Sequence, residues 1–122
     1  MKSPVTYYDL AGKEIMSKGT GKAIAYFDNG KIAYEAIYKD GCRDGLAIWY
    51  YDNGQIEQAA IYKYSLPKSP NGLRWEIISS FNGDGTAREK GDLKNGSGTW
   101  ILYDDTGKVS KINRYSNGVP ID

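Results

Sequence analysis

Side chains that usually carry catalysis or bind metals are sparse in this sequence. Its 122 residues include no histidine and a single cysteine, Cys42. Without histidine there is no Ser-His or Cys-His nucleophile and no imidazole metal ligand, and we find no phosphate-binding loop motif. A lone cysteine forms no intrachain disulfide, and we expect Cys42 to lie exposed in a turn without a catalytic role. We therefore predict that the protein is not an enzyme and has no cofactor.

Two polar segments have some features of metal sites, and both are better explained as turns. The segment NGDGTARE, residues 82–89, begins like a calcium loop, but the twelfth position counted from Asn82 is Leu93 and not a bidentate glutamate. The segment KDGCRDG, residues 39–45, contains only two carboxylates, with Arg43 between them. Asp and Gly are typical turn residues. We predict no metal site.

The charge and the composition limit which classes of partner and which compartments we expect. The formal net charge is +1, so neither nucleic acid nor an anionic membrane surface is an expected partner. No stretch approaches the roughly 20 apolar residues of a membrane span. The start of the chain shows no signal peptide and a single cysteine suits the cytoplasm, whereas prior removal of a signal would allow export; the sequence does not decide between the two.

The chain contains an internal repeat with a period of 24 residues in its clearest copies. A glycine leads the segments KAIAYFDNGKI, LAIWYYDNGQI and TWILYDDTGKV, at Gly21, Gly45 and Gly98, and a turn glycine follows nine residues later, at Gly30, Gly54 and Gly107. Each copy then runs to a tyrosine, at Tyr38, Tyr62 and Tyr115. Two extended runs around a glycine turn are typical of a β-hairpin.

The repeat predicts an all-β fold, in which antiparallel hairpins form a single curved and twisted meander sheet of roughly eight to ten strands. We expect one domain, residues 1–122, with about five hairpin repeats. The first repeat is truncated, and the fourth carries an insertion at 64–74 that includes the proline-containing loop YSLPKSPNG.

The turn type decides which residues share a face of the sheet. A three-residue loop ending in a left-handed Gly54 pairs Tyr50 with Ile56, and equivalent left-handed glycines are expected at Gly30 and Gly107. With this register we expect a buried face that carries Ile24, Tyr26, Ile32, Ala36, Tyr38, Ile48, Tyr50, Ile56, Ala60, Tyr62, Ile101, Tyr103, Val109 and Tyr115. The opposite face then carries Ala25, Phe27, Glu35, Ile37, Trp49, Tyr51, Glu57, Ile61, Trp100, Leu102 and Asp104.

The succession of glycine, aromatic run, YYDNGQI and YKDGCRDG resembles the variant MORN repeat of bacterial proteins, many of which are called YwqK-type antitoxins. The resemblance extends from about Tyr7 to Gly118 and is strongest over residues 21–63. The tryptophan that the family places two residues after the leading glycine is kept only at Trp100, and alanine replaces it at Ala23 and Ala47. The resemblance implies a hairpin-repeat fold and a protein that acts by binding, without shared catalytic residues.

We therefore expect a non-catalytic protein-binding module, most concretely an antitoxin or immunity protein that masks a partner protein such as a toxin. The candidate partner-binding residues are Phe27, Trp49, Tyr51, Ile61, Lys68 and Arg74. The alternative is a carbohydrate-binding or scaffold module of the cell envelope, because the aromatic repeats also resemble those of glucan-binding modules. In a further interpretation, Trp49, Trp75 and Trp100 simply pack the sheet faces. The sequence leaves the oligomeric state open.

Overall fold

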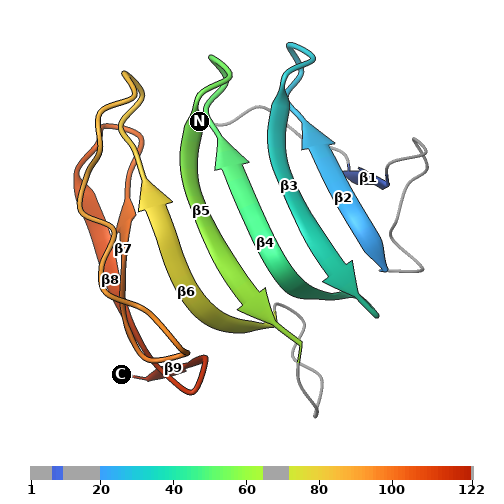
Figure 1. Ribbon diagram of the computed structural model, residues 1–122. Helices are drawn as coiled ribbons and strands as arrows, with labels where there is room; N and C mark the ends of the chain where they lie inside the picture. Colours follow the sequence, from blue (N-terminus) through green and yellow to red (C-terminus); the bar gives the residue numbers. More distant parts are fainter. Residues whose placement is uncertain (1–6, 10–19, 65–71, 122) are drawn as a thin grey trace.

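A computed structural model describes residues 7–9, 20–64 and 72–121. These residues form nine β-strands: β1 (Tyr7–Asp9), β2 (Gly21–Tyr26), β3 (Ile32–Lys39), β4 (Cys42–Tyr50), β5 (Ile56–Lys63), β6 (Leu73–Ser80), β7 (Gly98–Tyr103), β8 (Val109–Ser116) and β9 (Val119–Ile121). Among the described residues there is no helix long and apolar enough to cross a membrane. The predicted all-β meander of antiparallel hairpins is confirmed (Figure 1).

The strands form two sheets where the sequence predicted one. A six-stranded sheet has the order β1 to β6, and a three-stranded sheet has the order β7 to β9. The chain between β6 and β7 runs beside both sheets, because the Ile77 amide donates to the Leu93 carbonyl and the Leu93 amide donates to the Thr99 carbonyl, at 3.1 and 2.9 Å. Residues 81–97 contain two turns, and residues 88–93 between them form no regular strand.

Two kinds of turn alternate along the meander. At one end, three-residue turns close with a left-handed glycine, and Gly30, Gly54 and Gly107 have φ of 86°, 91° and 85°, as predicted. At the other end, two-residue turns have both central residues at positive φ, as at Asp40 and Gly41, with φ of 49° and 83°. Because this second turn is so short, Cys42 already belongs to β4 and is fully buried, so the prediction of an exposed cysteine in a turn was wrong.

The three clear repeats share one register. Tyr50 pairs with Ile56 as predicted, and the equivalent pairs are Tyr26 with Ile32 and Tyr103 with Val109. The leading glycine lies opposite the tyrosine that ends the hairpin in each repeat, for example Gly45 opposite Tyr62. A glycine at this position leaves room for the ring across the strand pair.

A β-bulge next to this pair reverses the predicted faces of the second strand. Tyr50 pairs with Ile56 but Trp49 pairs with Gln58, so Glu57 is the extra residue. Because side chains alternate with a period of two, one extra residue exchanges the faces of every residue that follows it. Tyr62 therefore shares its face with Trp49, although the sequence analysis placed it with Tyr50. The same bulge occurs in the other two repeats.

The core lies on the face that carries Trp49, which we call the inner face. Its buried members are Ala25, Tyr34, Ala36, Ala47, Ala60, Tyr62, Ile77, Leu93, Trp100 and Tyr115, with Tyr38, Trp49 and Leu102 packed against them. Trp100 comes from β7, and its ring centroid lies 6.0 Å from that of Trp49 and 6.1 Å from that of Tyr62. The Trp100 side chain of the second sheet thus packs against the inner face of β4 and β5.

The expectation that Tyr26, Tyr50 and Tyr103 are mostly buried was wrong. Tyr26 is 39% exposed, and Tyr50 and Tyr103 are half-buried. These tyrosines precede the bulge and lie on the face opposite the core. The buried aromatic rings are instead those of Phe27, Trp100, Tyr34, Tyr62 and Tyr115.

Candidate functional site

The six candidate partner-binding residues are spread over different parts of the fold. Phe27 is 4% exposed, Trp49 packs against the core, and Tyr51 is half-buried, with its hydroxyl donating to the Phe81 carbonyl at 2.6 Å. Ile61 lies on the other face of the sheet, opposite Leu46. The guanidinium of Arg74 lies 5.8 Å from the centroid of the Tyr115 ring. Lys68 lies outside the described residues. These candidate residues therefore do not share one face of the sheet.

An arginine is embedded in the inner aromatic face. The Arg43 guanidinium lies 5.4, 5.8 and 5.0 Å from the ring centroids of Tyr34, Trp49 and Tyr62 and donates to the Tyr34 hydroxyl. Burial raises the pKa of the Tyr62 hydroxyl to about 12 and raises that of Tyr34 further, so both remain neutral at physiological pH. Cation–π contacts of this kind stabilise the packing of the rings. We interpret Arg43 as a structural residue.

Hydrogen bonds link the three-residue turns side by side. The side-chain amide of Asn29 donates to the Asp52 carbonyl at 3.0 Å, and the side-chain amide of Asn53 donates to the Gly83 carbonyl at 2.9 Å. At the equivalent position of the next turn, residues 82–85, the chain has Asp84. An ionised carboxylate has no N–H to donate, so this residue cannot continue the series.

A cleft of about 560 Å³ lies along these turns. Its lining is formed by the aromatic side chains Phe27, Tyr50 and Tyr51 together with the turns that contain Asp52, Asp84 and Asp104. Two candidate residues from the sequence analysis, Phe27 and Tyr51, therefore meet here. The lining contains five carboxylates, from Asp52, Glu57, Asp84, Asp104 and Asp105, and one cation, Arg88.

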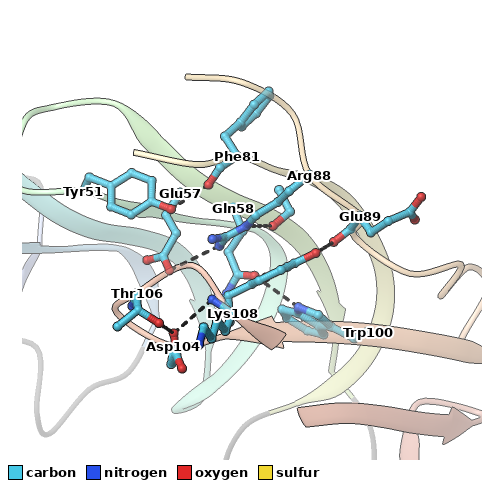
Figure 2. A network of polar contacts seen from close by, with 12 residues as sticks. Tyr51, Glu57, Gln58, Phe81, Arg88, Glu89, Trp100, Asp104, Thr106 and Lys108 are labelled. Carbon is cyan, nitrogen blue, oxygen red and sulfur yellow. Dashed lines mark hydrogen bonds and ion pairs between the residues drawn. The ribbon is translucent and has the colours of Figure 1, made fainter. Parts of the chain in front are cut away.

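The cation is fixed by partners on several sides (Figure 2). Arg88 Nη2 lies 3.5 Å from Glu57 Oε2, and Arg88 Nε donates to Ser80 Oγ at 2.8 Å. The guanidinium carbon lies 4.0 Å from the centroid of the Tyr103 ring, and the side chain is only 8% exposed. Because Arg88 is paired with Glu57, it leaves four lining carboxylates outside this ion pair.

The turn carboxylates are held in their ionised form by threonine. The Thr106 hydroxyl donates to Asp104 Oδ1 at 2.6 Å, and the amides of Thr106 and Lys108 donate to the same atom. These hydrogen bonds lower the pKa of Asp104, and Thr86 lowers that of Asp84 in the same way. Both groups are therefore charged throughout the neutral range.

We predict that Thr106→Val raises the pKa of Asp104 towards the ordinary value of about 3.9. Because the folded pKa is depressed, these bonds stabilise the fold above the ordinary pKa, and that contribution is lost as pH falls through the folded value. An NMR titration of the Asp104 side chain between pH 2 and 6 measures the shift. Thr106→Ser keeps the hydroxyl and is expected to keep the low pKa; an equal pKa in all three proteins would show that the hydroxyl is not the cause.

The face opposite the core carries exposed apolar side chains. We call the set Tyr26, Ile37, Leu46, Ile48, Tyr50, Ile56 and Ile61, which β2 to β5 present together, the outer apolar face. Tyr26, Ile37, Leu46 and Ile56 are 39, 45, 40 and 38% exposed. The ion pair of Lys22 with Glu35, at 3.6 Å, lies within this face. Exposed apolar surfaces of this kind often mark sites of protein binding. Within the described part of the chain, no group of three acidic or cysteine side chains is arranged to hold a metal ion.

This fold defines the class of protein as an all-β hairpin-repeat protein. Comparison with known families identifies the repeat: residues 20–40 and 43–64 each match the MORN repeat variant. The two matches cover the β2–β3 and β4–β5 hairpins. Proteins with such repeats generally use them for non-catalytic binding or scaffolding. No curated protein and no solved structure matches the chain.

Sequence reasoning missed the part played by Arg88 and Tyr103. Arg88 lies in the segment 82–89 that was correctly interpreted as a turn, and the Asn82 amide donates to the Thr86 carbonyl at 2.8 Å as a hairpin turn requires. Nothing in the local sequence indicates that Glu57, 31 residues earlier, is its partner. The signal available in the sequence was a change of residue type between repeats. Glu57 is acidic, whereas the equivalent residue of the preceding repeat is Ala33.

Proposed function

We propose that the protein is a non-catalytic module that binds another protein on its outer apolar face. The observation that supports this is the set of aliphatic and aromatic side chains that β2 to β5 leave uncovered, four of which are 38–45% exposed. Removing such side chains from water stabilises a complex by about 25 cal/mol per Å² of apolar surface, before the costs of association. Binding of this kind requires complementarity of surfaces and no reaction.

In its more specific form, the proposal is that the protein masks its partner by occlusion, as an antitoxin or immunity protein does. A broad sheet face suits this role because it covers a surface without entering an active site. The alternative, a carbohydrate-binding module, draws less support, because the Trp100 ring is 4% exposed and Trp49 packs against it, so neither ring offers a free face for stacking on a sugar.

The test begins by identifying the partner through crosslinking and co-purification from cells of the source organism. Affinity of the purified partner is then measured by calorimetry for the wild-type protein and for Leu46→Lys. We expect at least about a thirtyfold loss of affinity, corresponding to about 2 kcal/mol for an anchor residue. The matched control is Ile112→Lys, which places the same charge on β8 at a residue that is 54% exposed.

Affinity within about twofold of wild type is expected for the control. Unchanged binding by Leu46→Lys, with the fold intact by circular dichroism, would reject the outer apolar face as the interface. The antitoxin form is tested separately, by asking whether the protein restores growth of cells that express the partner. Failure of rescue would overturn the masking role and leave the binding role standing.

A further inference from the structure

We infer that the cleft along the three-residue turns receives a lysine or arginine side chain from a basic, extended segment of the partner. This inference rests on the proposed function and names the chemistry of that partner at a second surface. Tyr50 belongs to the outer apolar face and also lines the cleft, so one bound protein contacts both surfaces without a gap.

The first argument is the charge of the lining. Five carboxylates and one guanidinium give a net charge of −4 around the cleft, although the whole chain has a net charge of +1. The negative potential is therefore local, and it attracts cations while it repels phosphate and nucleic acid. Arg88 does not neutralise Asp52, Asp84 or Asp104, because its guanidinium is held by Glu57 and Ser80.

The second argument is the aromatic lining. Tyr51, which is half-buried, lines the same cleft as the carboxylates, and a cation beside the face of an aromatic ring gains electrostatic attraction in addition to its ion pairs. The aliphatic stem of lysine or arginine packs on such rings while the charged end reaches the carboxylates. A neutral sugar would use the Tyr51 ring but would form no ion pair with Asp84 or Asp104.

The third argument is the size and position of the cleft. A volume of about 560 Å³ is in the range of small-ligand pockets and exceeds the needs of one side chain, so a short segment of chain fits along the turns. The cleft lies beside Asp84, where the series of asparagine bridges between turns ends. The cleft therefore lies where the repeat is interrupted, and it is not a feature of every repeat.

The test uses defined peptides and the intact protein. Acetyl-Gly-Arg-Lys-Arg-Gly-amide is titrated into labelled protein and amide chemical shifts are followed, with a peptide that has norleucine at the three basic positions as its neutral counterpart. We expect shifts at Tyr51, Asp84 and Asp104 with the basic peptide only, and weaker binding as salt rises from about 0.05 to 0.5 M.

The decisive variant is Asp84→Asn with Asp104→Asn, which keeps the side-chain acceptors of both turns and removes two charges. We expect affinity for the basic peptide to fall about tenfold. The matched control is Asp92→Asn, because Asp92 accepts comparable bonds from Thr99 and does not line the cleft. The control is expected to bind as wild type does.

Three outcomes would overturn the inference: no shifts at the cleft, unchanged affinity of the double variant, or stronger shifts there with a neutral oligosaccharide than with the basic peptide. Failure here is distinguishable from failure of the proposed function. If Leu46→Lys abolishes binding of the partner while the peptide does not bind, the outer apolar face stands and the cleft is rejected.

Discussion

Trp100→Ala is expected to lower the free energy of unfolding by about 3–5 kcal/mol, the cost of removing a large buried aromatic side chain. Trp100 is 4% exposed, and its ring lies 6.0 to 6.5 Å from those of Trp49, Tyr62 and Tyr115, centroid to centroid. Its Nε1 donates to Gln58 Oε1 at 3.2 Å. Truncation removes contacts between the two sheets and leaves a cavity that the rigid strands cannot close.

Urea unfolding followed by circular dichroism measures the change, and two variants serve as controls. Tyr26→Ala removes an aromatic side chain that is 39% exposed on the other face, and we expect a loss of about 1 kcal/mol. Trp100→Phe keeps a ring but loses the hydrogen bond to Gln58, and an intermediate loss is expected. If Tyr26→Ala cost as much as Trp100→Ala, the core would lie on the face opposite the one described.

The contrast between Trp100 and Tyr26 also shows which features of the fold could be predicted from the sequence and which could not. The period of the glycines predicted the hairpins, the turn type and the pairing of Tyr50 with Ile56. These features could be predicted because each depends on residues that are close together in the chain. The bulge at Glu57 was not predictable from the same pattern. A single extra residue changes no spacing between repeats, and the residue itself has no characteristic type, being Ala33 in the preceding repeat and Ser110 in the last.

The consequence of the bulge was larger than its size, because it reversed the assignment of half of each hairpin. Ala36 and Ala60 were assigned to the face of Tyr26 and Tyr50. In the structure they lie on the opposite, inner face. The apolar pattern could not reveal the error, since both faces of this sheet are rich in apolar residues. The face with the alanines is the buried one because Trp100 of β7 packs against it, and this contact is not visible in the apolar pattern.

The cleft could not be predicted from the sequence for a different reason. Phe27 and Tyr51 were identified as candidate partner-binding residues, but their neighbours in the cleft belong to turns up to 80 residues away in the chain. The repeat predicts that the turns lie at one end of the sheet. It does not predict that Asp84 interrupts the asparagine bridges, because that depends on the geometry of two adjacent turns.

Gly91→Ala tests the irregular segment that joins the two sheets, and we expect it to lower the free energy of unfolding by about 2–5 kcal/mol. A Cβ added at Gly91 would lie 2.3 Å from the Thr99 carbonyl oxygen and 3.1 Å from Trp100 Cα, both in the backbone of β7. The adjacent Lys90 carbonyl accepts a bond from the Ile101 amide at 3.1 Å, so the two segments cannot separate without losing it. The φ of +97° adds strain for alanine.

The control is Gly30→Ala, which has a similar φ of +86° but no atom within 4 Å of the added Cβ. It carries only the cost of a left-handed alanine, about 1–2 kcal/mol. The difference between the two variants in urea unfolding isolates the steric contact from the backbone strain. Equal losses would mean that the segment around Gly91 does not press against β7. In that case the close packing of residues 90–93 against β7 would not contribute to holding the two sheets together.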